Sequence, residues 1–279
     1  MFATSVAVGA ITALPLVPTR LFGRRFFLLI GLISIVFFVL GMVSRGLAME
    51  PLYLCAAGFL ILYEITLPEN SPDNPALGEA AGGGARFGSA ARVFSLIALA
   101  LAIVAAWSGT VVEGWNLPRN IGGQTGGLLA GTSPGIVLFG YITSALLLGF
   151  ALVSMILGHW YLVSRKLSFT PLKVLTALLC FAVLLRGASI ALSVVDQGEY
   201  WGNAFSGGWT HYLLTGGLFT GCRLVLGIIL PAILAILSWR CAKIESNQSA
   251  TGILYVLVAF VFFGEIVSKH LLAHRGLVL

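Results

Sequence analysis

The chain has 279 residues, of which 58% are hydrophobic and only 9% are charged. A soluble domain is about 25% charged, so these few charges cannot cover a surface that faces water. The formal net charge of +6 comes from 16 Lys and Arg residues, which stand mostly between apolar runs, where membrane topology explains them better than nucleic-acid binding does. We therefore predict an all-α, polytopic membrane protein with a single transmembrane domain over residues 1–279.

Apolar runs near the roughly 20 residues that cross a bilayer as a helix follow one another along the chain. They lack the alternation of membrane-spanning strands. The first run is short and ends at Pro15 and Pro18; it counts as a span because it lacks the basic start and small-residue cleavage site of a signal peptide. The eight predicted spans are residues 2–17, 26–44, 51–67, 93–112, 135–163, 171–195, 211–239 and 249–272.

Charge counting predicts the orientation of these spans. Only Arg45, Arg119, Lys269 and Arg275 lie on the side that follows the even-numbered spans. The side that follows the odd-numbered spans holds the larger set, which is Arg20, Arg24, Arg25, Arg86, Arg92, Arg165, Lys166, Lys173, Arg240 and Lys243. Because positive residues remain in the cytoplasm, we predict that both termini lie outside.

Several ionisable residues interrupt the last three spans. At about 1.5 Å per residue, Arg186 and Glu265 reach the outer half of the membrane and Arg223 reaches its middle. A charge at mid-bilayer costs about 3 kcal/mol on insertion scales. These side chains should therefore face the bundle interior, either as helix ties or along a functional path. His211 stands close to the outer boundary, with Lys269 and His270.

One carboxylate cannot neutralise two guanidiniums, so this layer favours a ligand with partly negative oxygens that exchanges protons. A quinone has an apolar ring and tail that can be buried, and carbonyls that accept hydrogen bonds. It exchanges two protons when it is reduced or oxidised. We predict that Glu265 or His211 is the proton-exchanging group. The predicted quinone-binding residues are Arg186, Arg223, Lys269 and His270.

Two further polar residues lie near the cytoplasmic boundary. Glu64 follows the third span's apolar core, and His159 stands between Gly158 and Trp160. His159 is interpreted as an interfacial histidine, with haem ligation or the end of a proton path as alternatives. The four cysteines stand singly, without a C-x-x-C pair, so a zinc or iron–sulfur site on this chain is not expected. Electrons would have to continue to a partner's cofactor.

The stretch GEIVSK (264–269) resembles the G-E-x-x-G-R pattern in the last helix of the membrane-anchor subunits of dimethyl sulfoxide, polysulfide and nitrite reductases. Gly264 and Glu265 match, Ser268 replaces the second glycine, and Lys269 stands where that family has arginine. In the preceding span, GCRLVLGIILPAIL places Arg223 like the arginine that opens the family's penultimate apolar run. The resemblance covers about sixty residues at the C-terminal side.

The resemblance implies a haem-free anchor subunit in a bacterial inner membrane, with a menaquinone or ubiquinone site near the outer face. It also implies iron–sulfur and catalytic subunits docked on that face, so the chain itself would be a non-catalytic or quinone-site subunit of an oxidoreductase complex. A b-type cytochrome anchor is the first alternative, since His211 with His270 or His274 could ligate one haem. A transporter and a purely structural subunit are the others. Gly140, Ser144 and Gly149 predict only close helix packing.

Overall fold

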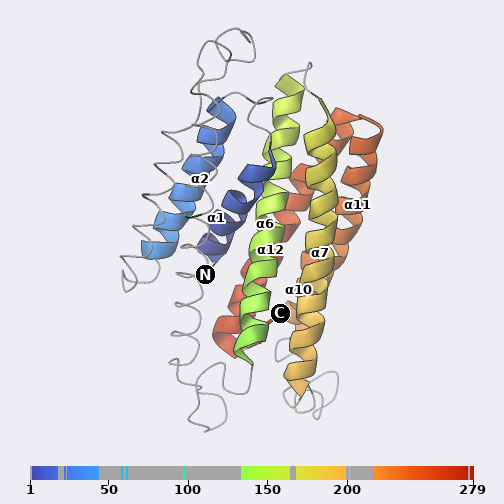
Figure 1. The fold of residues 1–279 in the computed structure, drawn as a ribbon. Helices are drawn as coiled ribbons and strands as arrows, with labels where there is room; N and C mark the ends of the chain where they lie inside the picture. Colours follow the sequence, from blue (N-terminus) through green and yellow to red (C-terminus); the bar gives the residue numbers. More distant parts are fainter. Residues whose placement is uncertain are drawn as a thin grey trace.

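A computed structural model gives the fold and describes residues 2–17, 22, 24–43, 58, 61, 97, 133–163, 168–198, 201, 217–275 and 277–279. The described residues contain no strand and form a bundle of helices (Figure 1). The elements are α1 (Phe2–Ala13), the 3₁₀ turn η1 (Leu14–Leu16), α2 (Arg24–Val43), α6 (Pro134–Val163), α7 (Thr170–Asp196), α10 (Leu218–Leu224), the π-helical turn η3 (Val225–Ile229), α11 (Leu230–Lys243) and α12 (Asn247–Arg275).

Among the described residues, four helices are long and apolar enough to cross a membrane: Gly135–Leu162, Thr170–Asp196, Leu218–Lys243 and Asn247–His274. The third of these is the continuous run of α10, η3 and α11. The prediction of an all-helical membrane protein is confirmed at this level. The four helices correspond to the predicted spans 135–163, 171–195, 211–239 and 249–272, although the third extends to Lys243. The predicted spans 51–67 and 93–112 fall almost entirely outside the described residues, and the sides on which the termini lie stay a prediction.

The first two predicted spans form shorter apolar helices, Phe2–Ala13 and Arg25–Gly41. At about 1.5 Å per residue, α1 is roughly 18 Å long, less than the hydrocarbon core of a bilayer. Most of its residues are buried, because α1 packs between α2 and α6. A Cβ atom built on Gly149 would lie 2.0 Å from the carbonyl oxygen of Gly9. The backbones of α1 and α6 therefore touch, which only small residues allow.

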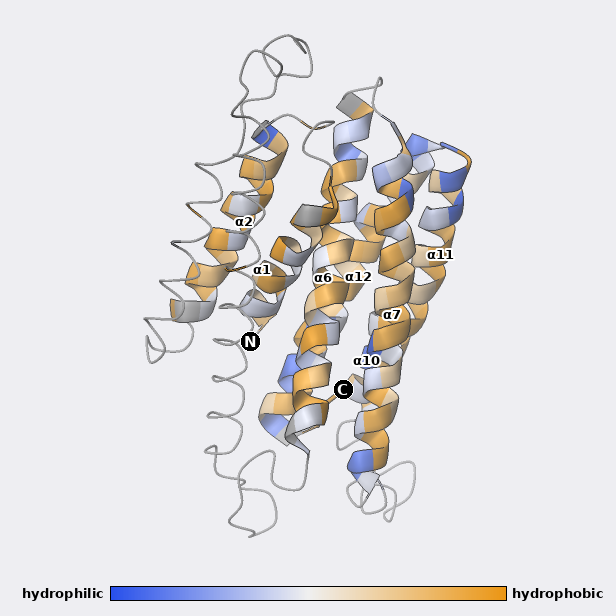
Figure 2. Ribbon diagram, viewed as in Figure 1, coloured by the Kyte–Doolittle hydropathy of each residue, from blue (hydrophilic) through white to orange (hydrophobic). Residues whose placement is uncertain are grey.

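The burial of the apolar side chains differs between helices inside the bundle and helices at its surface. Helix α6 lies inside the bundle, with buried residues such as Leu147 and Leu148 in its apolar core. Helices α7, α10 and α12 turn large apolar side chains outward, among them Leu184 at 70% exposure and Leu218 at 67%, as a lipid-facing surface requires. Hydrophilic residues gather where α11 and α12 join (Figure 2).

The turn between α11 and α12 has a helix-ending geometry. Glu245 has a positive φ of 58°, and its amide donates to the carbonyl of Ala242 at 3.2 Å. The amide of Ser246 donates to the carbonyl of Cys241 at 3.0 Å. This pattern satisfies the last carbonyls of a helix and usually carries glycine at the positive-φ position. Here Glu245 also pairs with Lys173 on α7, at 2.9 Å.

Pro231 creates an irregular turn within the run of α10, η3 and α11. Proline has no amide hydrogen, so it cannot donate the α-helical hydrogen bond to the carbonyl of Gly227. The helix widens there into the π-helical turn η3. The Gly227 carbonyl instead accepts a hydrogen bond from Nη1 of Arg223 at 3.4 Å. The carbonyl that Pro231 leaves without its helical donor is therefore a hydrogen-bond acceptor for the buried Arg223.

Candidate functional site

Glu265, on α12, is fully buried, and its carboxylate is the centre of the candidate site. Helices α6, α7 and α10 each contribute one residue that donates to it. Ser144 Oγ donates to Oε2 at 2.6 Å, Arg186 Nε donates to Oε1 at 2.9 Å, and Arg223 Nη2 donates to the same Oε1 at 2.8 Å. One carboxylate thus connects four helices. We call Ser144, Arg186, Arg223 and Glu265 the polar layer.

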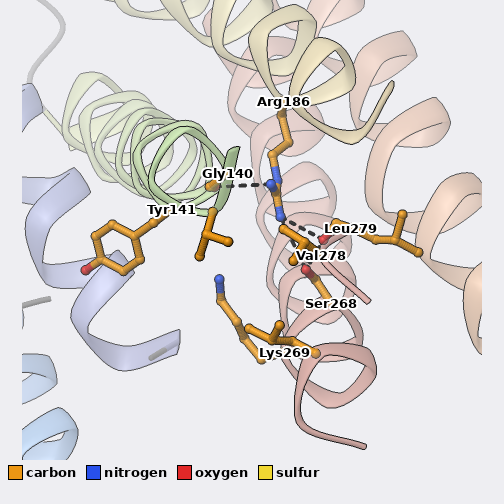
Figure 3. A pocket seen from close by; sticks show the side chains of 9 residues that line it. Gly140, Tyr141, Arg186, Ser268, Lys269, Val278 and Leu279 are labelled. Carbon is orange, nitrogen blue, oxygen red and sulfur yellow. Dashed lines mark hydrogen bonds between the residues drawn. The ribbon is translucent and has the colours of Figure 1, made fainter. Parts of the chain in front are cut away.

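Arg186 binds Glu265 through two nitrogens, because Nη2 also donates to Oε2 at 3.3 Å. A guanidinium held in this way has a fixed plane. Its outer nitrogens reach other elements: Nη1 donates to the carbonyl of Gly140 at 3.1 Å, and Nη2 donates to Ser268 Oγ at 3.2 Å and to the main-chain oxygen of Leu279 at 2.9 Å (Figure 3). Arg186 therefore links the carboxylate on one side to an oxygen site on the other.

Arg223 is completely buried between α10 and α12. The space for its guanidinium depends on two glycines. A Cβ atom built on Gly264 would lie 2.3 Å from the Cα of Gly227 and 3.0 Å from Nη1 of Arg223. Gly264, which precedes Glu265 in the chain, therefore lets α12 approach the π-helical turn η3 closely.

Three of the four residues of the polar layer lie at one depth in the bundle. Ser144, Arg186 and Glu265 are each ten residues, about 15 Å, from the end of their helix at the same side of the bundle. These helices are roughly 40–45 Å long, while the hydrocarbon core of a bilayer is about 30 Å thick. A bundle centred in a bilayer would place these three residues inside the hydrocarbon core and to one side of its centre, and the depth predicted from the sequence stays a prediction.

The polar layer carries more positive than negative charge. Of the acidic residues that the structure describes, Asp196 accepts from the amide of Ser133 and Glu245 pairs with Lys173. Only Glu265 meets Arg186 and Arg223. Formal counting gives +1 for two guanidiniums and one carboxylate. Such a charge inside a membrane is costly unless polar groups surround it.

A small pocket borders the layer between α6, α7, α12 and residues 277–279. Its polar lining is Gly140, Arg186, Ser268 and Lys269, and its apolar lining is Val137, Tyr141, Leu272, Val278 and Leu279. In Figure 3 the Lys269 amine points toward α6, and Nζ lies 6.0 Å from the centroid of the Tyr141 ring. The cavity volume of about 30 Å³ has room for one or two waters, against roughly 300–1,000 Å³ in a typical ligand site.

Residues 277–279 close this pocket on one side. Leu277, Val278 and Leu279 are each less than 10% exposed. The Leu277 amide donates to the carbonyl of Leu271 at 3.4 Å, and the Val278 amide donates to Gln197 Oε1 at 3.3 Å. The main-chain oxygen of Leu279 accepts from Ser268 Oγ as well as from Arg186. The segment therefore brings a main-chain oxygen to the donors of the pocket.

The predicted site residues separate into three groups. Glu265, Arg186 and Arg223 meet in the polar layer, and Lys269 lines the adjoining pocket. His270 is exposed, with its ring centroid 4.3 Å from that of His274, and it does not line the pocket. Near the other end of the bundle, Nδ1 of His159 lies 3.0 Å from the hydroxyl of Tyr255. His211 and Glu64 lie outside the described residues.

Sequence reasoning missed several partners of the charged residues. Ser144 and Gly140 stand in an apolar run, where small residues indicate close packing rather than a role in binding Glu265 and Arg186. Ser268 was read only as a departure from a family motif, although it binds Arg186. The spacing of Gly140 and Ser144 is one sequence signal for this role, because residues four apart share one face of a helix, here α6.

No protein-family model, curated protein or solved structure matches the chain. The described residues also contain no group of three or more His, Cys, Asp or Glu side chains that could hold a metal ion. The polar layer and its pocket are therefore the features that indicate a function.

Proposed function

We propose that this chain is the membrane subunit of an electron-transfer complex and exchanges electrons and protons with a quinone beside the polar layer. One observation carries the proposal: Arg186 and Arg223 share the single carboxylate of Glu265, and the surplus positive charge borders a pocket that Lys269 also lines. Hydrogen-bond donors around an apolar cavity suit an uncharged molecule with electron-rich oxygens. A quinone in a membrane has this chemistry.

The contacts suggest a separate role for each side chain. Both oxygens of Glu265 are engaged by donors, so this residue positions Arg186 rather than exchanging protons. Arg186 Nη2 and Ser268 Oγ would donate to a quinone carbonyl. In quinol oxidation, the Lys269 amine would accept one of the two protons released as two electrons pass to an iron–sulfur cofactor of a partner subunit. In the reverse direction, protonated Lys269 would donate one of the two protons that complete the quinol. The second proton would come from the outer aqueous phase.

The proposal is tested on the complex purified in detergent with its co-purifying subunits. Quinol-dependent electron transfer is measured for the wild type, for Lys269→Gln and for Lys243→Gln. Lys243 is the matched control, since its Nζ lies over the Trp239 ring at 3.7 Å near the opposite end of the bundle. We expect Lys269→Gln to lose at least tenfold in rate with assembly intact, and Lys243→Gln to keep its rate. Full activity in an assembled Lys269→Gln complex would contradict the proposal.

The second candidate function is a purely structural subunit. It is favoured by the saturation of Glu265, whose carboxylate connects four helices without an exposed atom. This alternative predicts no dependence of quinol turnover on Lys269, so the same comparison separates the two. A reduced-minus-oxidised visible spectrum of the preparation tests the cytochrome alternative, because a b-type haem lost in His270→Ala or His211→Ala would assign haem to this chain.

A further inference from the structure

The main-chain oxygen of Leu279 marks a binding position for a ligand oxygen. It accepts hydrogen bonds from Nη2 of Arg186 at 2.9 Å and from Oγ of Ser268. Both donors are buried, at 2% and 4% exposure. Two donors from different helices thus converge on one main-chain oxygen inside the bundle, beside Lys269 and the small pocket.

We propose that residues 277–279 are an internal plug, and that a quinone carbonyl takes the position of the Leu279 oxygen when this segment withdraws. The inference rests on the proposed function, because it identifies where the quinone binds. In the structure the quinone site is closed by this segment, and the segment must withdraw before a quinone can bind.

The size of the cavity supports this exchange. At about 30 Å³, the pocket cannot admit a quinone ring beside the seated segment. Removing Leu277, Val278 and Leu279 would join the volume of their buried side chains to the pocket. The walls then exposed would be mainly apolar, with Ile190, Val267 and Leu271 in the cluster that now surrounds Leu277 and Leu279. An apolar quinone ring would take the place of the apolar side chains of the segment, and one quinone carbonyl would take the place of the Leu279 oxygen.

The hydrogen bonds also favour exchange over simple removal. A buried donor left without an acceptor costs about 1–3 kcal/mol. Ser268 Oγ, which donates to the Leu279 oxygen, therefore resists the loss of this oxygen unless another replaces it, whereas Nη2 of Arg186 keeps Oε2 of Glu265 as an acceptor. The amides that hold the segment make longer contacts, 3.4 Å from Leu277 to Leu271 and 3.3 Å from Val278 to Gln197. A plug seated most of the time lowers the apparent affinity for the ligand by the fraction of open molecules.

A reversible disulfide tests the plug directly. A Cβ atom built on Gly140 would lie 3.6 Å from Cγ1 of Val278, the branch that the sulfur of a cysteine at position 278 would replace, so the two cysteine side chains would be in contact. We would make Gly140→Cys/Val278→Cys in the full chain, with Cys55, Cys180, Cys222 and Cys241 replaced by alanine. Binding of decylubiquinone to the detergent-purified protein is measured by equilibrium dialysis before and after reduction. Val278→Cys alone, treated identically, is the control.

We expect the oxidised double variant to bind decylubiquinone at least tenfold more weakly than the same protein after reduction, with no such change in the control. Equal binding by the locked and reduced forms would overturn the plug while leaving a quinone site elsewhere on the chain. Absence of binding by every form, the wild type included, would overturn the proposed function itself.

A second variant covers a failure of the double cysteine protein to fold. Leu277→Gly/Leu279→Gly removes the apolar anchors of the segment and keeps its main-chain oxygen. Because the plug then unseats more readily, we expect several-fold tighter binding of decylubiquinone than in the wild type. Unchanged or weaker binding by the folded variant would contradict the inference.

Discussion

The described part of the chain contains two kinds of ion pair, which lie in opposite halves of the bundle. Lys173 and Glu245 meet at 2.9 Å with side chains that are 34% and 58% exposed. In the polar layer, Glu265 meets Arg186 and Arg223 at similar distances, 2.9 and 2.8 Å, with side chains that are 0–3% exposed. The two kinds of ion pair thus have similar distances between their charged atoms, but one is exposed and the other is buried.

The comparison shows that surroundings, rather than distance, decide what an ion pair does. Water screens the exposed pair, so replacing either residue lowers the free energy of unfolding only slightly. The buried charges were removed from water during folding, and each depends on the partners that replaced it. The two buried guanidiniums and one carboxylate also carry a formal charge of +1, which is costly inside a membrane unless polar groups surround it.

The largest expected effect comes from Glu265→Gln. The change leaves two buried guanidiniums without a carboxylate, and breaking a buried pair costs about 3–5 kcal/mol. Glu245→Gln is the matched control, with an expected loss of at most about 1 kcal/mol. Both are compared by unfolding in detergent. Similar losses for the two variants would show that burial does not distinguish the pairs.

Gly264→Ala tests the packing that makes room for Arg223. Its Cβ would lie 2.3 Å from the Cα of Gly227, a backbone clash that flexible side chains cannot relieve. Overpacking of this kind costs about 1–3 kcal/mol, and we expect the upper end. Gly252→Ala, on the same helix with nothing within 4 Å, should be neutral or slightly stabilising. Thermal unfolding of both variants checks the difference.

Ser144→Ala removes the 2.6 Å hydrogen bond to Oε2 of Glu265. A hydrogen bond to a charged group contributes about 1.5–3 kcal/mol, so we expect a loss near 2 kcal/mol. Ser238→Ala is the control, because Ser238 is also buried but donates only to the carbonyl of Ala235 in its own helix. Its loss should stay below about 1 kcal/mol. Unfolding curves that coincide would contradict a special role for Ser144.

The smallest effect is expected from Lys173→Gln, at about 0.5 kcal/mol. The screening length falls from about 8 Å at 0.15 M salt to about 3 Å at 1 M, so the effect should vanish at high salt. The loss caused by Glu265→Gln should persist there. Unfolding at both salt concentrations sharpens the comparison between the two kinds of pair, and a salt-sensitive polar layer would contradict its burial.

Hydropathy predicts much of the described fold, because apolar runs that cross a membrane must be helical. Depth along those helices also predicts that Arg186, Arg223 and Glu265 share a layer. Rotation explains one difference within the candidate site. At about 100° per residue, Lys269 lies 40° around α12 from Glu265, whereas His270 lies about 140° away and is exposed.

The remaining features depend on tertiary contacts that have no pattern in the sequence. Ser144 resembles any small residue of a packed helix until Glu265 is placed against it. Residues 277–279 are a short apolar segment without periodicity, and only the fold brings the Leu279 oxygen to Arg186. The π-helical turn follows from Pro231, but its value in placing Arg223 becomes visible only when α12 is present.

The central claim is that the polar layer holds Arg186 ready for a ligand, beyond tying the helices together. The paired variant Glu265→Gln/Arg223→Met tests it most directly, because it removes one negative and one positive charge and so keeps the net charge. Assembly and the affinity for decylubiquinone are measured on the same purified protein. We predict a folded protein whose affinity falls at least tenfold, since glutamine cannot hold Arg186 as a bidentate carboxylate does. A folded variant that binds the quinone as tightly as the wild type would contradict the account.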